Sequence, residues 1–152
     1  MTNFFRSLIV PVLTLAVALT APLAPAAATS DLADTVGQTL IQTMSKVSGD
    51  TFAYETARFE EADNTVVLEN LTLTREKAKQ PSVTIESARI LAPVMMENGG
   101  FTADSVTTLG IALHGRSVKG TVASAQASNV TVQPADQIVE GAISQWFRYE
   151  TS

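Results

Sequence analysis

The stretch that decides the fold is residues 66–74, Val66-Val67-Leu68-Glu69-Asn70-Leu71-Thr72-Leu73-Thr74. Apolar and β-branched residues alternate here at a period of two, which is typical of a strand with one buried face. The phase of the alternation changes inside the stretch, because Leu68 and Leu71 stand three residues apart. We expect a bulge or a sharp bend near Glu69-Asn70 that turns both halves of the strand toward one core.

The same period extends from this stretch over most of the chain, with turn-forming residues between the segments. The strand candidates are Phe52 to Phe59, Thr65 to Arg75, Ser82 to Met95, Phe101 to Leu113, and Ser117 to Val132. The separators are short enough to join antiparallel neighbours. Several of these strands are longer than usual, and Gly110 and Gly120 offer further places to bend. A long, curved antiparallel β-meander of about five strands is therefore predicted.

Amphipathic helices are expected on both sides of the sheet in sequence. Residues Ser30 to Ser48 carry an apolar face at helical spacing, with Ser30 as N-cap and Gly49-Asp50 as the end. That face consists of Leu32, Val36, Leu40, Met44 and Val47. A second such face, with Trp146 and Phe147, occurs in Pro134 to Tyr149 and is expected to cover the sheet. The predicted fold class is α+β.

Residues 1–28 precede this domain and have the composition of a secretory signal peptide. Arg6 is followed by the apolar run Leu8 to Leu19 and then by a small-residue segment ending in Ala26-Ala27-Ala28. We expect cleavage before Thr29, which leaves one domain over residues 29–152. The alternative is an uncleaved membrane anchor, which Pro11, Pro22 and Pro25 disfavour because proline breaks the helical hydrogen-bond pattern.

Charge and cysteine content exclude several classes of protein. The chain has 10 basic and 15 acidic side chains, and its formal charge is −5. The leader holds one of the basic side chains and none of the acidic ones, so the exported domain is more acidic still, which argues against nucleic acid and anionic membranes. The absence of cysteine excludes a lipoprotein anchor and disulfide bonds. A periplasmic location in a bacterial envelope is predicted, with no stable membrane anchor after cleavage.

Candidate chemical groups are few, and each has a simpler structural explanation. His114 is the single histidine; it is better explained as a turn residue than as part of a triad with Ser117 or Ser105. Met95-Met96 suits packing better than copper binding, since further soft ligands are lacking. Glu69 and Glu86 are a conceivable acid and base pair of the kind that cleaves glycosides, but they are better explained as outward-facing strand residues. We expect no enzyme, no cofactor and no metal.

The strand signatures resemble those of the AsmA-like envelope proteins and related β-groove modules. The resemblance rests on residues 66–74, Val83 to Ile90, and Gly99 to Leu113. It implies a β-groove for a hydrophobic ligand, although AsmA-like proteins are larger and keep a membrane anchor. It transfers no functional residues to this chain.

The resulting expectation is an exported, non-enzymatic protein that binds a hydrophobic or lipid ligand, or supports envelope maintenance. The residues expected to line a groove are Leu71, Leu73, Ile85, Ile90, Leu109 and Ile111. The alternative is a structural or adaptor module that docks another envelope protein through an apolar surface, with Trp146 and Phe147 as the partner-binding residues. An open groove favours the ligand, and a filled core with one apolar patch favours the partner protein.

Overall fold

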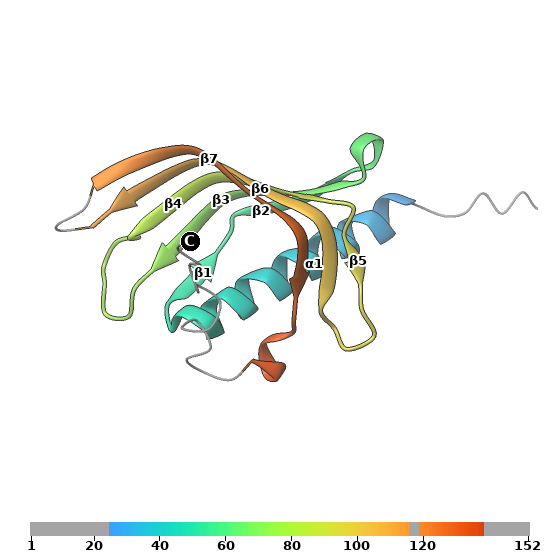
Figure 1. Cartoon of the computed structure of the whole chain (residues 1–152), viewed down its shortest axis with the longest axis horizontal. Coiled ribbons are helices and arrows are strands. Elements are labelled where there is room, and N and C mark those ends of the chain that lie inside the picture. Colours follow the sequence, from blue (N-terminus) through green and yellow to red (C-terminus); the bar gives the residue numbers. More distant parts are fainter. Residues whose placement is uncertain (1–24, 116–118, 139–152) are drawn as a thin grey trace, which may run out of the picture.

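The structure is a computed structural model and describes residues 25–115 and 119–138. One helix precedes an open antiparallel sheet of seven strands that curves over it (Figure 1). The elements are α1 Pro25–Ser48, β1 Thr51–Ala53, β2 Thr56–Glu60, β3 Thr65–Thr74, β4 Val83–Leu91, β5 Val94–Met95, β6 Phe101–His114 and β7 Lys119–Val132, with 3₁₀ turns η1 Glu61–Asp63 and η2 Ala135–Gln137. The expected α+β class and antiparallel sheet are confirmed.

The sheet has seven strands where about five were expected, because two of the predicted strands are interrupted. The first divides at Tyr54-Glu55 into β1 and β2, which both pair with β3. The other divides at Ala92-Pro93 into β4 and β5. Ala92 has a φ of 50°, and Pro93 has no N–H to donate, so the ladder cannot continue through them.

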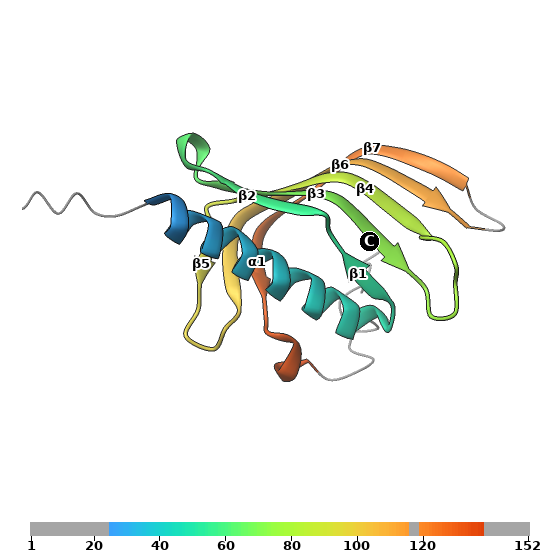
Figure 2. The ribbon, with the colours of Figure 1, turned by 180° about the vertical axis from the view of Figure 1, so that it is seen from behind.

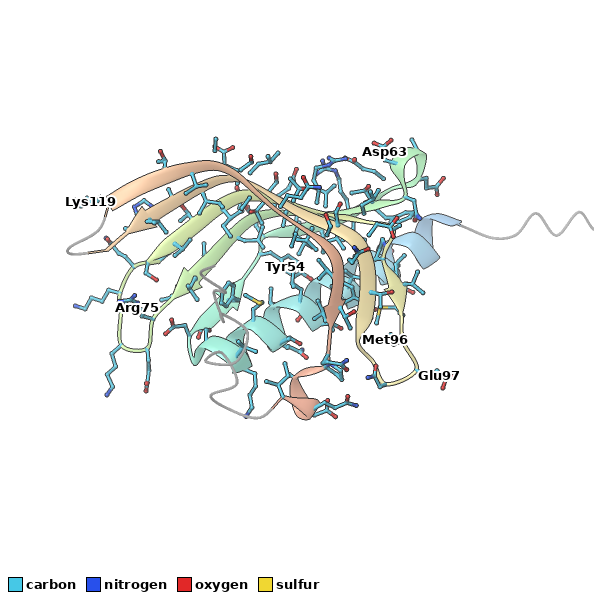
Figure 3. The ribbon with its side chains drawn as sticks, viewed as in Figure 1. Tyr54, Asp63, Arg75, Met96, Glu97 and Lys119 are labelled. Carbon is cyan, nitrogen blue, oxygen red and sulfur yellow. The ribbon has the colours of Figure 1, made fainter. Side chains whose placement is uncertain are left out.

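Hydrogen bonding joins the strands in the order β1-β3-β4-β6-β5, while β2 pairs with β3 and β7 pairs with β6. Two long hairpins, β3 with β4 and β6 with β7, point in the same direction. Arg75 and Lys119 lie at their tips, and Asp63, Met96 and Glu97 lie in turns at the opposite end of the molecule (Figure 3). The tips extend well past α1, as the reverse view also shows (Figure 2).

Helix α1 packs on the concave side of the sheet with most of the expected face: Val36 belongs to the core, and Leu32 and Leu40 pack against it. Val36 and Ala33 are fully buried, whereas Met44 is 39% exposed. The contact also includes Gly37, where a Cβ would lie 2.9 Å from the Tyr54 ring and 3.0 Å from Leu68. A small-residue stripe lets the helix approach the sheet closely, and larger apolar side chains flank the contact.

The core lies between α1 and the half of the sheet nearest to it. Its buried residues are Ala33, Val36, Val66, Leu68, Leu71, Ala88, Ile90, Phe101, Ala103 and Val132. The helix is tied to the end of β7 by the buried Thr43 hydroxyl, which donates to the Gln133 carbonyl at 2.6 Å. Tyr54 adds a second polar contact, because its hydroxyl accepts from Gln38 Nε2 at 3.2 Å.

Both ends of the predicted domain differ from expectation or lie outside the described residues. Helix α1 begins at Pro25, so Ser30 is inside it and is not its N-cap. At the other end, the described part of Pro134 to Tyr149 forms the 3₁₀ turn η2, not an α-helix, and Trp146 and Phe147 lie outside the described residues. Among the helices that the structure describes, none has the length and apolar character needed to span a membrane.

Candidate functional site

A row of residues across four strands interrupts the β-ladder. On both sides of the row the strands pair in one unchanged register. The pairs that this register would form within the row are missing, namely Asn70 with Glu86, Glu86 with Gly110, and Gly110 with Ala123. We call these four residues the transverse row. The sheet bends along it, and each strand changes the face to which its alternating side chains point.

Left-handed backbone at two of these positions explains the bend. Asn70 has a φ of 52° and Gly110 a φ of 63°, a region that asparagine and glycine tolerate best. The side chain of Glu86 lies across Gly110, where a Cβ would overlap its Cγ and Cδ. The Asn70 amide is also held, since Nδ2 donates to Glu55 Oε2. The expected bend near Glu69-Asn70 and the one at Gly110 are confirmed.

The expected bend at Gly120 is wrong, and a different residue bends β7. Gly120 pairs regularly with Leu113 and has no left-handed backbone. Instead, Asn129 has a φ of 52°, and the ladder skips its pairing with Asp104. The lack of a side chain permits a bend but does not require one, so glycine alone was an ambiguous signal.

Beyond the transverse row, apolar side chains continue the core along the concave face. Ile85 lies directly between Leu71 and Ile111 across the ladder, and directly opposite residues share a face. Leu71 belongs to the buried core, and Ile85 packs against it. The set, which we call the concave strip, is Leu71, Leu73, Val83, Ile85, Ile111, Leu113 and Val122.

The concave strip is less covered than the core from which it starts. Leu71 is 5% exposed, while Val122 at the other margin of the strip is 44% exposed. Leu73, Ile85 and Ile111 between them are half-buried. Helix α1 packs mainly on β1, β2 and β3, so the far ends of β4 and β6 project past it (Figure 2).

The structure brings four of the six predicted groove residues together and separates two. Leu71, Leu73, Ile85 and Ile111 lie in the concave strip. Ile90 points to the same side but is fully buried in the core. Leu109 lies on the convex face, paired with Ser87, and is 37% exposed.

The residues that the six-residue prediction missed are Val83, Leu113 and Val122, whose partners in the ladder place them in the strip. Alternation continued outward from Leu71 and Ile85 would have found Val83. Val122 needed the β6–β7 register, which the sequence does not specify locally.

The convex face carries an ion-pair network over the opposite side of β2, β3 and β4. Arg58 bonds to Glu69 and, at 3.0 Å, to Glu60. Arg89 Nη2 lies 2.6 Å from Glu60 Oε2. Val67 stands between the two arginines in the register and is only 2% exposed, although it lies on the face away from α1. Aliphatic stems of long charged side chains commonly cover apolar residues in this way.

Hydrogen bonds between the charged side chains shift the pKa values within this network. The bonds to Glu69 and then to Glu60 raise the pKa of Arg58 above its ordinary value. Arg89, followed by Arg58, lowers the pKa of Glu60, and Arg58, followed by Thr56, lowers the pKa of Glu69. All three groups are charged at neutral pH, and each charge has a partner. Such a network stabilises local structure and offers no poised acid or base.

The remaining candidate groups are dispersed. His114 Nε2 lies 3.2 Å from the Thr84 hydroxyl, and Ser105 is toward the opposite end of β6. Ser117 lies outside the described residues. Glu69 is opposite Ser87, not Glu86, so the two carboxylates do not face each other. Met95 packs against the core.

Within residues 25–115 and 119–138, no group of three or more His, Cys, Asp or Glu side chains is placed to hold a metal ion. Comparison with known proteins adds no assignment: no family model, curated protein or solved structure matches the chain. The resemblance to AsmA-like envelope proteins stays a prediction.

Proposed function

We propose that this chain is an exported, non-enzymatic protein of the bacterial envelope that binds a hydrophobic ligand, such as an acyl chain, on its concave strip. The observation that carries the proposal is the continuity of the strip with the core. Apolar side chains extend over β3, β4, β6 and β7 beyond the transverse row, past the reach of α1. A sheet face that only needed to be soluble would carry polar residues there.

The chemistry of the strip selects the class of ligand. Its side chains are all aliphatic, so they offer apolar contact area and no hydrogen bonds. Threonines alternate with them along β3, and Thr84 lies opposite Thr72, on the convex side. A flexible acyl chain can lie along such a surface, because it requires contact area more than directional bonds.

Two neighbouring residues of β6 provide a matched test. Ile111 lies in the concave strip, and Leu109 lies on the convex face two positions earlier. The affinity of the purified exported protein for a fluorescent fatty acid is expected to fall at least about fivefold in Ile111→Asn, because an amide buried under the ligand without partners costs more than about 1 kcal/mol. Leu109→Asn is expected to bind like the wild type.

Native mass spectrometry of the wild-type protein, released gently from cells, gives an independent readout. Co-purified lipid supports the proposal. For the comparison of the two variants, circular dichroism must show that both are folded. Absence of both lipid and fatty-acid uptake in the wild type rules the proposal out and favours the adaptor alternative. Equal loss in both variants also contradicts it, since binding would then not depend on the concave face.

A further inference from the structure

Strand β7 is a long edge strand. It pairs with β6 along one side, and no strand among the described residues pairs with its other side. Every residue from Lys119 to Asn129 is exposed. An edge of this kind presents a row of unpaired N–H and C=O groups to which another strand can bind.

The composition of β7 does little to block such pairing. Proteins usually protect an edge with proline, with several charges, or by keeping the edge strand short. β7 has 14 residues, no proline, and a single charged residue, Lys119, at its very start. The remaining residues are uncharged, so no charge along the strand would repel a neighbouring copy.

The sequence of β7 is also nearly the same in both directions. Residues 121–131 read Thr-Val-Ala-Ser-Ala-Gln-Ala-Ser-Asn-Val-Thr, and only Ala123 and Asn129 break the symmetry about Gln126. An antiparallel pair formed by two copies of one strand has a two-fold axis, and such an interface requires each residue to suit its symmetry mate. A palindromic strand meets that requirement at every matched position.

The two interruptions of the β6–β7 ladder are placed symmetrically along β7, with left-handed backbone in β7 at Asn129 and in β6, at Gly110, opposite Ala123. Ala123 lies in the transverse row, and Asn129 is the left-handed residue opposite Asp104. These two interruptions are equally distant from Gln126, and they are the two positions at which the palindrome fails. In an antiparallel pair centred on Gln126, the interruption at Ala123 of one copy would lie opposite the interruption at Asn129 of the other, so the two irregular positions of each strand would coincide with those of its partner.

We infer that two copies of this chain associate through β7, with Gln126 beside Gln126 of the second copy on the two-fold axis. Ser124 then lies opposite Ser128 of the second copy, and Val122 opposite Val130. The sheet continues across the dimer, and the two concave strips become parts of one longer curved surface. The pairing does not depend on the ligand proposed above, since it uses the edge of the sheet and not its concave face.

Single cysteines test both the dimer and its register, because the chain has no cysteine of its own. In Gln126→Cys the two thiols would lie on directly opposite residues, whose Cα atoms are about 5 Å apart in antiparallel pairs. In Ser124→Cys, on the same face, they would be offset by about 13 Å along the strands. A disulfide tolerates a Cα separation of only about 7 Å. We expect at least about tenfold faster cross-linking of Gln126→Cys than of Ser124→Cys.

Sedimentation of the cysteine-free protein and a charge exchange complete the test. Gln126→Lys and Gln126→Glu, each alone, place like charges beside one another and are expected to dissociate, while their equimolar mixture re-forms the dimer. A wild-type protein that stays monomeric at every concentration overturns the inference. So does equal cross-linking of the two cysteine variants, or a mixture of the charge variants that fails to associate when both fold normally.

Discussion

At the scale of single residues, a few left-handed positions determine which faces of the strands are buried. Asn70 and Gly110 reverse the alternation of β3 and β6 at the transverse row, and Asn129 does so in β7. The sequence signalled the first of these through the spacing of three between Leu68 and Leu71. The same spacing separates Ala127 from Val130, so that bend was readable as well. Glycine was the weaker signal, because its freedom is used at Gly110 and not at Gly120.

Gly110→Ala should be strongly destabilising, and Gly120→Ala should not. Alanine at position 110 is strained by the φ of 63° and overlaps the Glu86 side chain, so a loss of more than about 1 kcal/mol is expected. At position 120 a Cβ meets nothing within 4 Å. Urea unfolding of both variants measures the difference. Equal midpoints would contradict the role given to the transverse row.

At the scale of elements, the sequence located α1 and the long strands but only part of the face on which the helix docks. Helical periodicity correctly placed Leu32, Val36 and Leu40 against the core, but it included the exposed Met44 and missed the contacts of Ala33 and Gly37. Gly37 closely approaches Tyr54, and long-range contacts of this kind leave no local pattern. Likewise, β1 and β2 were joined in the prediction because alternation continues through the break between them.

The ion pairs that link β2, β3 and β4 predict a pH dependence of stability. The folded-state pKa of Glu69 is lowered from its ordinary value of 4.5, so its stabilising effect is complete above that value and is lost as the pH falls through the lower folded pKa. Glu69→Gln lacks this effect. The difference in Tm between wild type and Glu69→Gln should therefore shrink as the pH falls from neutral to about 3.

Glu97→Gln provides the control for this measurement. Glu97 is exposed in the turn that follows β5 (Figure 3), and it takes no part in the ion pairs of the network. Its Tm is expected to follow the wild type at every pH. A difference between wild type and Glu69→Gln that stays constant with pH would show that the glutamate acts by packing and not by its charge.

At the scale of the whole molecule, the transverse row divides the sheet into a half covered by α1 and a half that extends beyond it. The class, the antiparallel order and the curvature followed from alternation and short turns. The part of the sheet that extends beyond α1 did not, because it depends on where the helix ends relative to the row. The sequence predicted four of the concave strip residues for the same reason that it predicted the strands, namely their periodicity.

Hydrogen exchange should report this division directly. Amides of Val66, Leu68 and Ile90 are expected to exchange only through global unfolding, since their side chains are fully buried under α1. Amides of Leu73, Val83 and Leu113 should exchange faster, through local opening of the hairpin ends. Peptide-resolved mass spectrometry of the native protein measures both sets. Uniform protection across the row would contradict the division.

The transverse row also constrains how the length of this chain can change over evolutionary time. In every strand that crosses the row, the number of residues on each side determines which side chains point to the concave face. A shift of one residue therefore exchanges the two faces. A single-residue insertion between Thr65 and Thr74 would bring threonines into the interior and expel leucines. Insertions and deletions in descendants of this sequence should therefore gather in residues 75–82, between β3 and β4, while substitutions accumulate freely at the exposed positions of the strands.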